Sequence, residues 1–164
     1  MIKNPKNLIL FAVIGGVFGI GLGLTIGRPS APKSAAVSIS DAKAEMTTVL
    51  IAQQEAWNAG DIDGYMQGYL QSDKLRFASG GDITLGWHKT LNRYKMRYSD
   101  RAKMGRLRFD IESVDVFDEF NGQIFGKWTL FRDADKPSGL FTLHMKKGRD
   151  GWKVVSDHTS SASN

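Results

Sequence analysis

The chain contains no cysteine in its 164 residues. This absence excludes disulfides, thiolate metal sites and thiol nucleophiles together, although it does not identify a cellular compartment. Histidine is also scarce, because only His88, His144 and His158 occur, and their positions do not have the spacing of metal ligands. We therefore predict no metal and no cofactor.

Acidic residues are missing from the first 40 positions, where Lys3, Lys6, Arg28 and Lys33 are the only charged side chains. The formal net charge of +5 comes mostly from this segment, since the 22 Lys and Arg minus these four leave 18 bases against 17 acids. The remainder of the chain is near neutral. It also carries no zinc-finger or P-loop motif, so nucleic acid is not an expected partner.

A long apolar run occupies residues 8–26, "LILFAVIGGVFGIGLGLTI", without a charged residue. At about 1.5 Å per residue it nearly spans a hydrocarbon layer of about 30 Å. Cleaved signal peptides have shorter apolar stretches followed closely by a small-x-small site, whereas the nearest such site here is residues 34–36. The sequence therefore favours a retained membrane anchor in residues 1–27. A cleaved signal is the alternative.

Glycines recur every fourth residue within this run, which places them along one stripe of a helix. They are Gly15, Gly19, Gly23 and Gly27. The stripe is either a face for packing against another membrane helix or an example of the general frequency of glycine in membrane helices. The amino-terminal lysines favour a cytoplasmic start and a domain on the other side, which we expect to be periplasmic at a bacterial inner membrane.

A short linker, residues 28–40, leads into a domain whose helical patterns come first and whose strand patterns follow. Helical spacing is found at about residues 40–60, 62–70 and 86–98, separated by a short strand at residues 75–79. From residue 107 onward the apolar period is two, with a break in parity near Glu112 and Ser113 that predicts a β-bulge. Asn121 and Gly122 predict a hairpin turn. The order of elements predicts an α+β fold with a long antiparallel meander.

Several stretches resemble the nuclear transport factor 2-like superfamily, in particular its SnoaL-like and ketosteroid-isomerase-like bacterial branch. They are "AWNAGDIDGYMQGYLQSDKLRF", "GWHKTLNRYKMRY", "FGKWTLFR", "GLFTLHMKK" and "GWKVVSDHTSS", within residues 41–161, ahead of a tail at 162–164. The resemblance implies a cone in which a strongly curved, mainly antiparallel sheet wraps three helices. It also implies a pocket at the wide end and, in many members, a homodimer formed through the sheet.

The resemblance also shows whether isomerase catalysis is to be expected, because ketosteroid isomerases carry a carboxylate base on the strand that corresponds to residues 75–79. The matching position is Ala78 or Ser79, and neither can abstract a proton from carbon as a carboxylate would. The isomerase tyrosine of the first helix corresponds to Gln53. Isomerase chemistry of that type is therefore not expected.

His158 is the remaining catalytic candidate, because a histidine near a pocket can act as an acid or a base near neutral pH. Regular strand alternation places His158 on the same face as Trp152 and Val154, and places Asp157 on the opposite face. The alternative is that His158 caps the strand end through hydrogen bonds to the backbone.

Other candidate pocket residues are aromatic or basic. An aromatic set could line an apolar pocket: Trp57, Tyr65, Tyr69, Phe77, Trp87, Tyr94 and Trp128. Tyr65, Trp87 and Tyr98 are selected as ligand-binding residues because each has a polar atom that seeks a partner when buried. Arg76 and Arg132 could bind an acidic ligand, with ion pairs to nearby acids as the alternative.

Two functions remain open on the sequence. The first is a non-catalytic binding or assembly module, anchored in the membrane and dimeric or part of a larger membrane complex. The second is a small-molecule isomerase, cyclase or hydrolase that uses His158 together with Tyr65 or Arg76. The anchor and the missing carboxylate base favour the first.

Overall fold

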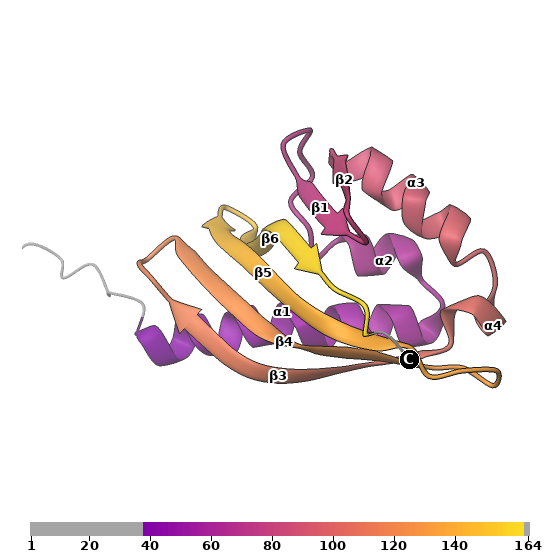
Figure 1. The fold of residues 1–164 in the computed structure, drawn as a ribbon. Helices are drawn as coiled ribbons and strands as arrows, with labels where there is room; N and C mark the ends of the chain where they lie inside the picture. Colours follow the sequence, from indigo (N-terminus) through magenta and orange to yellow (C-terminus); the bar gives the residue numbers. More distant parts are fainter. Residues whose placement is uncertain (1–37, 163–164) are drawn as a thin grey trace, which may run out of the picture. The chain divides into compact units, whose positions relative to one another are not determined.

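The computed structural model describes residues 38–162, which form one α+β domain with a six-stranded sheet that is visibly curved (Figure 1). The helices are α1 (Ile39–Ala59), α2 (Ile62–Met66), α3 (Trp87–Arg97) and α4 (Arg101–Met104). The strands are β1 (Arg76–Ser79), β2 (Asp82–Leu85), β3 (Arg106–Val116), β4 (Asn121–Phe131), β5 (Ser138–Gly148) and β6 (Gly151–Thr159). Helix α4 and strand β2 had no counterpart in the sequence prediction. The predicted anchor, the glycine stripe and most of the linker lie outside the described residues.

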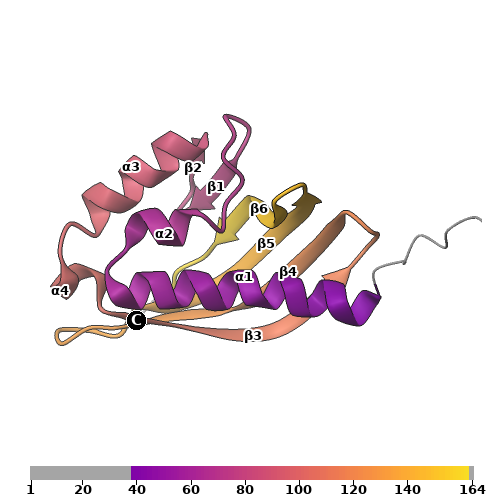
Figure 2. The same cartoon turned by 180° about the vertical axis from the view of Figure 1, so that it is seen from behind.

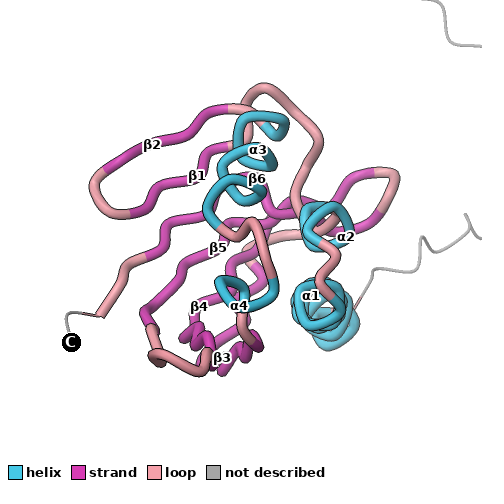
Figure 3. The backbone as a smooth tube through the Cα atoms, turned by 90° about the vertical axis from the view of Figure 1, so that its right-hand side faces the viewer, coloured by secondary structure: helices cyan, strands magenta, loops and turns pink. Residues whose placement is uncertain are grey.

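The sheet is mixed, with the strand order β2-β1-β6-β5-β4-β3 (Figure 3). Every neighbouring pair is antiparallel except β1 and β6, which run parallel, with Phe77 opposite Asp157. Helix α1 packs on β3, β6 and α2, and α3 packs on α2 and β2 (Figure 2). The predicted long antiparallel meander is therefore confirmed for β3 to β6, and the first two strands extend it through the parallel pair.

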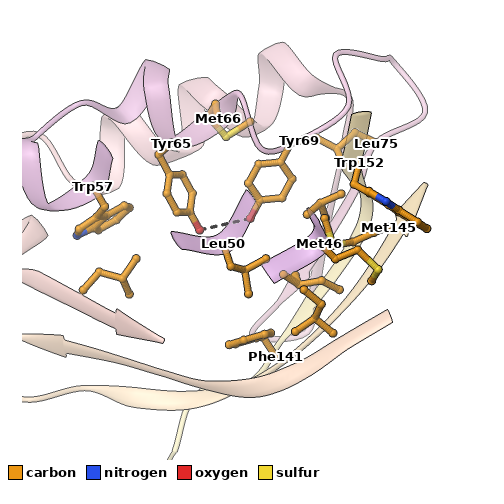
Figure 4. Close-up of a cluster of buried hydrophobic side chains, with 14 of the residues drawn as sticks. Met46, Leu50, Trp57, Tyr65, Met66, Tyr69, Leu75, Phe141, Met145 and Trp152 are labelled. Atoms are coloured by element: carbon orange, nitrogen blue, oxygen red, sulfur yellow. Dashed lines mark hydrogen bonds between the residues drawn. The ribbon is translucent and has the colours of Figure 1, made fainter. Parts of the chain in front are cut away.

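Helix α1 begins and ends close to the predicted positions because both ends have clear caps. The Ser38 side chain accepts a hydrogen bond from the Asp41 amide at 3.1 Å, and Gly60 ends the helix in the left-handed region with φ of 86°. Its buried side recurs every three or four residues: Ala42, Met46, Leu50, Gln53 and Trp57. This stripe faces the sheet, and its apolar side chains form part of the hydrophobic core (Figure 4).

The second helix is shorter than predicted. It starts at the predicted position, after Asp61, whose side chain accepts from the Gly64 amide at 2.7 Å, but it ends at Met66 rather than at residue 70. The chain then leaves the helix to pair with β6, since the Gly68 carbonyl and the Leu70 amide both bond to the backbone of Val154. This pairing satisfies backbone groups that one further helical turn would have used.

Two bulges interrupt the sheet, and only one of them was predicted. The register of β3 against β4 shifts between Ile111 and Ser113, where the parity break had indicated it. The second shift lies between β5 and β6, where Met145 pairs with Val154 and His144 pairs with Ser156, so that Val155 is the extra residue. A bulge of one residue exchanges the faces of all residues that follow it.

The predicted hairpin turn between β3 and β4 was misplaced. Asn121 and Gly122 are the first two residues of β4, and the turn uses residues 117–120 instead. The Asp118 carboxylate closes this turn by accepting from the Phe120 amide at 2.7 Å and from the Asn121 side chain at 2.9 Å. Within residues 38–162, no helix is both long and apolar enough to cross a membrane.

Candidate functional site

A cavity of about 90 Å³ lies between the helices and the concave face of the sheet. Its wall is mainly aromatic and aliphatic, with polar groups at a few points. The lining residues are Gln53, Trp57, Tyr65, Tyr69, Phe77, Ser79, Arg93, Tyr94, Arg97, Tyr98, Leu107, Phe109, Trp128, Leu130, Phe141, Leu143, Asp157, Thr159 and Ser161. An apolar wall with a few converging polar groups is the usual composition of a small-molecule site.

Asp157 is the only acidic residue of this wall, and its side chain is almost fully buried, with 4% exposed. Tyr69 donates a hydrogen bond to Oδ2 at 2.7 Å, and Thr159 donates to Oδ1 at 2.6 Å. Burial raises the pKa of Asp157 from 3.8 to about 6, although the bonds from Thr159 and Tyr69 and the nearby charge of His158 oppose this shift. Asp157 therefore changes its charge close to neutral pH.

Two tyrosines extend the polar network from Asp157: Tyr69, which follows the end of α2, and Tyr65 on α2. The hydroxyls of Tyr65 and Tyr69 are 3.4 Å apart and point toward each other (Figure 4). Because the Tyr69 hydrogen is given to Asp157, the Tyr65 hydroxyl is the donor in this contact. Burial, followed by the charge of Asp157, raises the pKa of both phenols, so that both stay protonated as donors.

The aromatic wall is packed edge to face, which holds the tyrosines in place. The Trp57 ring lies 5.2 Å from the Tyr65 ring and 4.7 Å from the Tyr98 ring, and Tyr94 lies 5.3 Å from Tyr65, measured between ring centres. Trp57 is itself fixed by donating its indole N–H to the Met104 carbonyl at 3.2 Å. Such edge-to-face contacts stabilise the packing of the wall.

Two arginines of α3 lie at the outer part of the wall. The Arg93 guanidinium is 5.4 Å from the centre of the Phe77 ring and donates to the Thr84 hydroxyl at 3.4 Å. The Arg97 guanidinium is 5.9 Å from the centre of the Tyr98 ring. Arg93 is half-buried and Arg97 is exposed, so this edge of the cavity is its mouth toward solvent.

The six residues predicted for the site are only partly brought together. Tyr65 and Tyr98 line the cavity, whereas Trp87 donates its indole N–H to the Met66 carbonyl at 2.9 Å and joins α3 to α2. Arg132 forms an ion pair with Asp135 at 2.6 Å, which was the alternative considered for it. Arg76 is exposed on β1 and is not part of the wall.

His158 does not line the cavity either, and its predicted face is wrong. Because Val155 is a bulged residue, the alternation of β6 changes after Val154, so Asp157 and Thr159 point inward and His158 is exposed. The same bulge explains why the sequence analysis missed Asp157. No feature of the local sequence marks this bulge, because it depends on how β5 and β6 pair.

The remaining predictions concern metals and the aromatic set. No group of three His, Asp or Glu side chains within residues 38–162 is placed to hold a metal ion. Of the seven aromatic residues considered as a set, all except Trp87 contribute to the wall of the cavity.

Comparison with known proteins places this architecture in a family. A solved NTF2-like protein of unknown function from Shewanella oneidensis shares 39% sequence identity over 71% of this chain and 97% of that chain, with a TM-score of 0.69. The chain belongs to the NTF2-like family, as the sequence resemblance indicated. No family model matches the chain, and no curated protein does.

More distant solved structures share the fold. A ketosteroid isomerase-like protein from Erwinia carotovora atroseptica is 16% identical over 74% of this chain and 96% of its own, with a TM-score of 0.61. An NTF2-like superfamily protein from Salmonella enterica is 14% identical over 77% of this chain and 95% of its own, with a TM-score of 0.58. At these identities the likeness concerns the fold alone, and one fold hosts many functions.

Proposed function

We propose that this NTF2-like domain is a non-catalytic binding module that encloses a small, mainly apolar molecule in its aromatic cavity. The observation that supports the proposal is the cavity itself, with an aromatic wall and one hydrogen-bonded polar network formed by Tyr65, Tyr69 and Asp157. Such a wall supplies contact area, and the tyrosines orient a polar group of the ligand. We further propose that residues 8–26 anchor the module to a bacterial inner membrane, with the domain in the periplasm.

A binding role is preferred over isomerase chemistry because the strand that carries the base in isomerases offers no carboxylate. Ser79 lines the cavity at this position, and Ala78 beside it does not. The Asp157 carboxylate is in the cavity wall, but a tyrosine and a threonine hydroxyl occupy its two oxygens. In the binding role, the module is a dimer or an accessory subunit of a membrane complex.

Native mass spectrometry of the full-length protein, extracted from its own membranes in a mild detergent, tests this proposal. We expect the intact chain, apart from amino-terminal trimming, to carry an additional small mass together with further subunits. Ser79→Phe should remove the small mass because the ring fills the cavity. Ala78→Phe is the matched control, since Ala78 is the neighbouring residue on β1 but is not part of the wall.

Two results would contradict the parts of this proposal separately. A chain that starts near residue 37 would show that the apolar run is a cleaved signal and not an anchor. A small mass retained in Ser79→Phe, or found in no sample, would contradict binding in the cavity.

A second candidate function is supported by one observation, the burial of the Asp157 carboxyl in the cavity wall, which raises its pKa to about 6. A carboxyl that titrates near neutral pH is suited to general acid–base catalysis. The enzyme alternative would then use Asp157 with Tyr69 and not the exposed His158. Incubation of the protein with its copurified molecule in D₂O tests it, because an enzyme of this kind would place deuterium on carbon and Asp157→Asn would not.

A further inference from the structure

We propose that the cavity selects small monocarboxylic acids, with the carboxylate held at the mouth by Arg93 and Arg97 and the apolar body inside. The inference rests on the proposed binding function and specifies its ligand. Three observations support it: the position of the two guanidinium groups, their lack of an acidic partner in the described part of the chain, and the presence of a single, buried acid in the wall.

The two arginines are placed to act together because they lie one helical turn apart on α3. Both contribute to the wall of the cavity, and each lies near an aromatic ring of that wall. A guanidinium near a ring keeps its N–H groups available at the edge of its plane. Two such groups at one mouth form a binding place for a planar anion such as a carboxylate.

The positive charge at this mouth has no acidic partner among the described residues. Neither Arg93 nor Arg97 belongs to any of the ion pairs formed within residues 38–162. Lys95 lies between them on the same helix and does form one, with Asp63 at 2.8 Å. Helix α3 therefore carries one ion-paired cation, Lys95, outside the cavity. Its two cations at the mouth of the cavity, Arg93 and Arg97, form no ion pair with any described residue.

Asp157 determines which way the ligand must point. It is the only acid of the wall, and its hydrogen bonds come from Tyr69 and Thr159 and not from either arginine. An anion placed beside Asp157 would be repelled by a like charge in a buried site. The acid group must therefore lie at the mouth, while the deep end accommodates an apolar group or a neutral group that bonds to Tyr65.

The volume limits the size of the buried part. An engineered apolar cavity of about 150 Å³ holds benzene, and the cavity here measures about 90 Å³. The enclosed space therefore suits a short alkyl chain or part of one ring, with the carboxylate outside it at the arginines. Hexanoate and phenylacetate meet these conditions, and hexanamide and phenylacetamide are their uncharged counterparts of the same shape.

Isothermal titration calorimetry on the full-length protein in lipid nanodiscs, at pH 7.5, tests the inference with these four compounds. We expect each acid to bind about tenfold more tightly than its amide, and Arg93→Gln with Arg97→Gln to bring the affinities for acid and amide to the same level. Lys95→Gln is the matched control on the same helix and should preserve the advantage. Ser79→Phe should abolish binding of acid and amide alike.

Equal affinity for acid and amide, or an acid preference that survives loss of both arginines, would overturn the inference. An equal loss of the preference in Lys95→Gln would also overturn it, because the effect would then come from the general charge of the helix. These outcomes differ from a failure of the proposed function, in which Ser79→Phe would leave all binding unchanged. A neutral copurified molecule excluded by Ser79→Phe would preserve the binding function and contradict the acid selectivity.

Discussion

At the scale of single residues, the site depends on one carboxyl group whose surroundings are mostly apolar. Asp157 has two hydroxyl donors, yet burial has the larger effect on it and raises its pKa to about 6. A folded-state pKa above the unfolded value means that the folded protein binds this proton more tightly. The contribution of Asp157 to stability is therefore greatest below pH 4 and is lost as the pH rises through about 6.

Replacing Asp157 by Asn should remove this pH dependence. The difference between 3.8 and about 6, at about 1.4 kcal/mol per pKa unit, corresponds to about 3 kcal/mol. We expect the free energy of unfolding of the variant, relative to that of the wild type, to increase by up to this amount between pH 4 and pH 8. Denaturant unfolding of both proteins at several pH values measures it, and Asp150→Asn in an exposed turn provides the control. A constant difference between variant and wild type would show that Asp157 does not titrate as described.

At the scale of elements, the end of α1 determines where the aromatic wall begins. Arg101 of α4 donates to the Trp57 carbonyl at 3.0 Å and to the Asn58 carbonyl at 3.0 Å, so it caps the last turn of α1. Gly60 then turns the chain toward α2 in a left-handed conformation. These caps position Trp57 on α1 and Tyr65 on α2, whose rings are in contact.

Gly60→Ala should therefore destabilise the domain by about 1 kcal/mol, because a Cβ is disfavoured at φ of 86°. The added methyl would also lie 3.2 Å from Cδ of Arg101, which can move. Gly148→Ala is the matched control, since a Cβ there meets no atom within 4 Å and its φ is not in the left-handed range. Unfolding midpoints in urea compare the two variants, and equal midpoints would show that the turn tolerates a side chain.

At the scale of the whole molecule, the proposed function depends on two separate parts of the chain. The domain formed by residues 38–162 contains the cavity, and residues 8–26 form the apolar run that the sequence indicates as an anchor. The first part is described by its fold and contacts. The second is a proposal that rests on length, lack of charge and the spacing of glycines.

The glycine spacing leads to a prediction for the full-length protein in membranes. If the stripe packs against another helix, Gly19→Leu with Gly23→Leu should weaken association, because the larger side chains keep the two backbones apart. Crosslinking yield in native membranes measures the change, with Ile20→Leu as a control of similar size in the same run. Undiminished crosslinking in the double variant would leave the stripe as an ordinary feature of membrane helices.

Local patterns determined much of the fold. The helical spacing of α1, its end at Gly60, the alternation of β3 and the first bulge are all readable from neighbouring residues, because periodicity and capping act over a few positions. The family resemblance, carried by short stretches in order, was also sufficient to indicate the NTF2-like fold. The lack of cysteine and the balance of charge excluded several kinds of site before any fold was considered.

The sequence indicated most of the aromatic wall, including Tyr65 and Tyr98, but the tertiary structure alone decided which charged side chains line the site. Asp157 meets Tyr69 across 88 positions of sequence, and it faces inward only because β6 pairs with β5 through an extra residue at Val155. The role of Arg93 and Arg97 also depends on the tertiary structure, since the sequence shows a basic helix but not which of its cations lack an acidic partner. Pairing across strands and ion pairs between elements depend on contacts distant in sequence, which local periodicity does not encode.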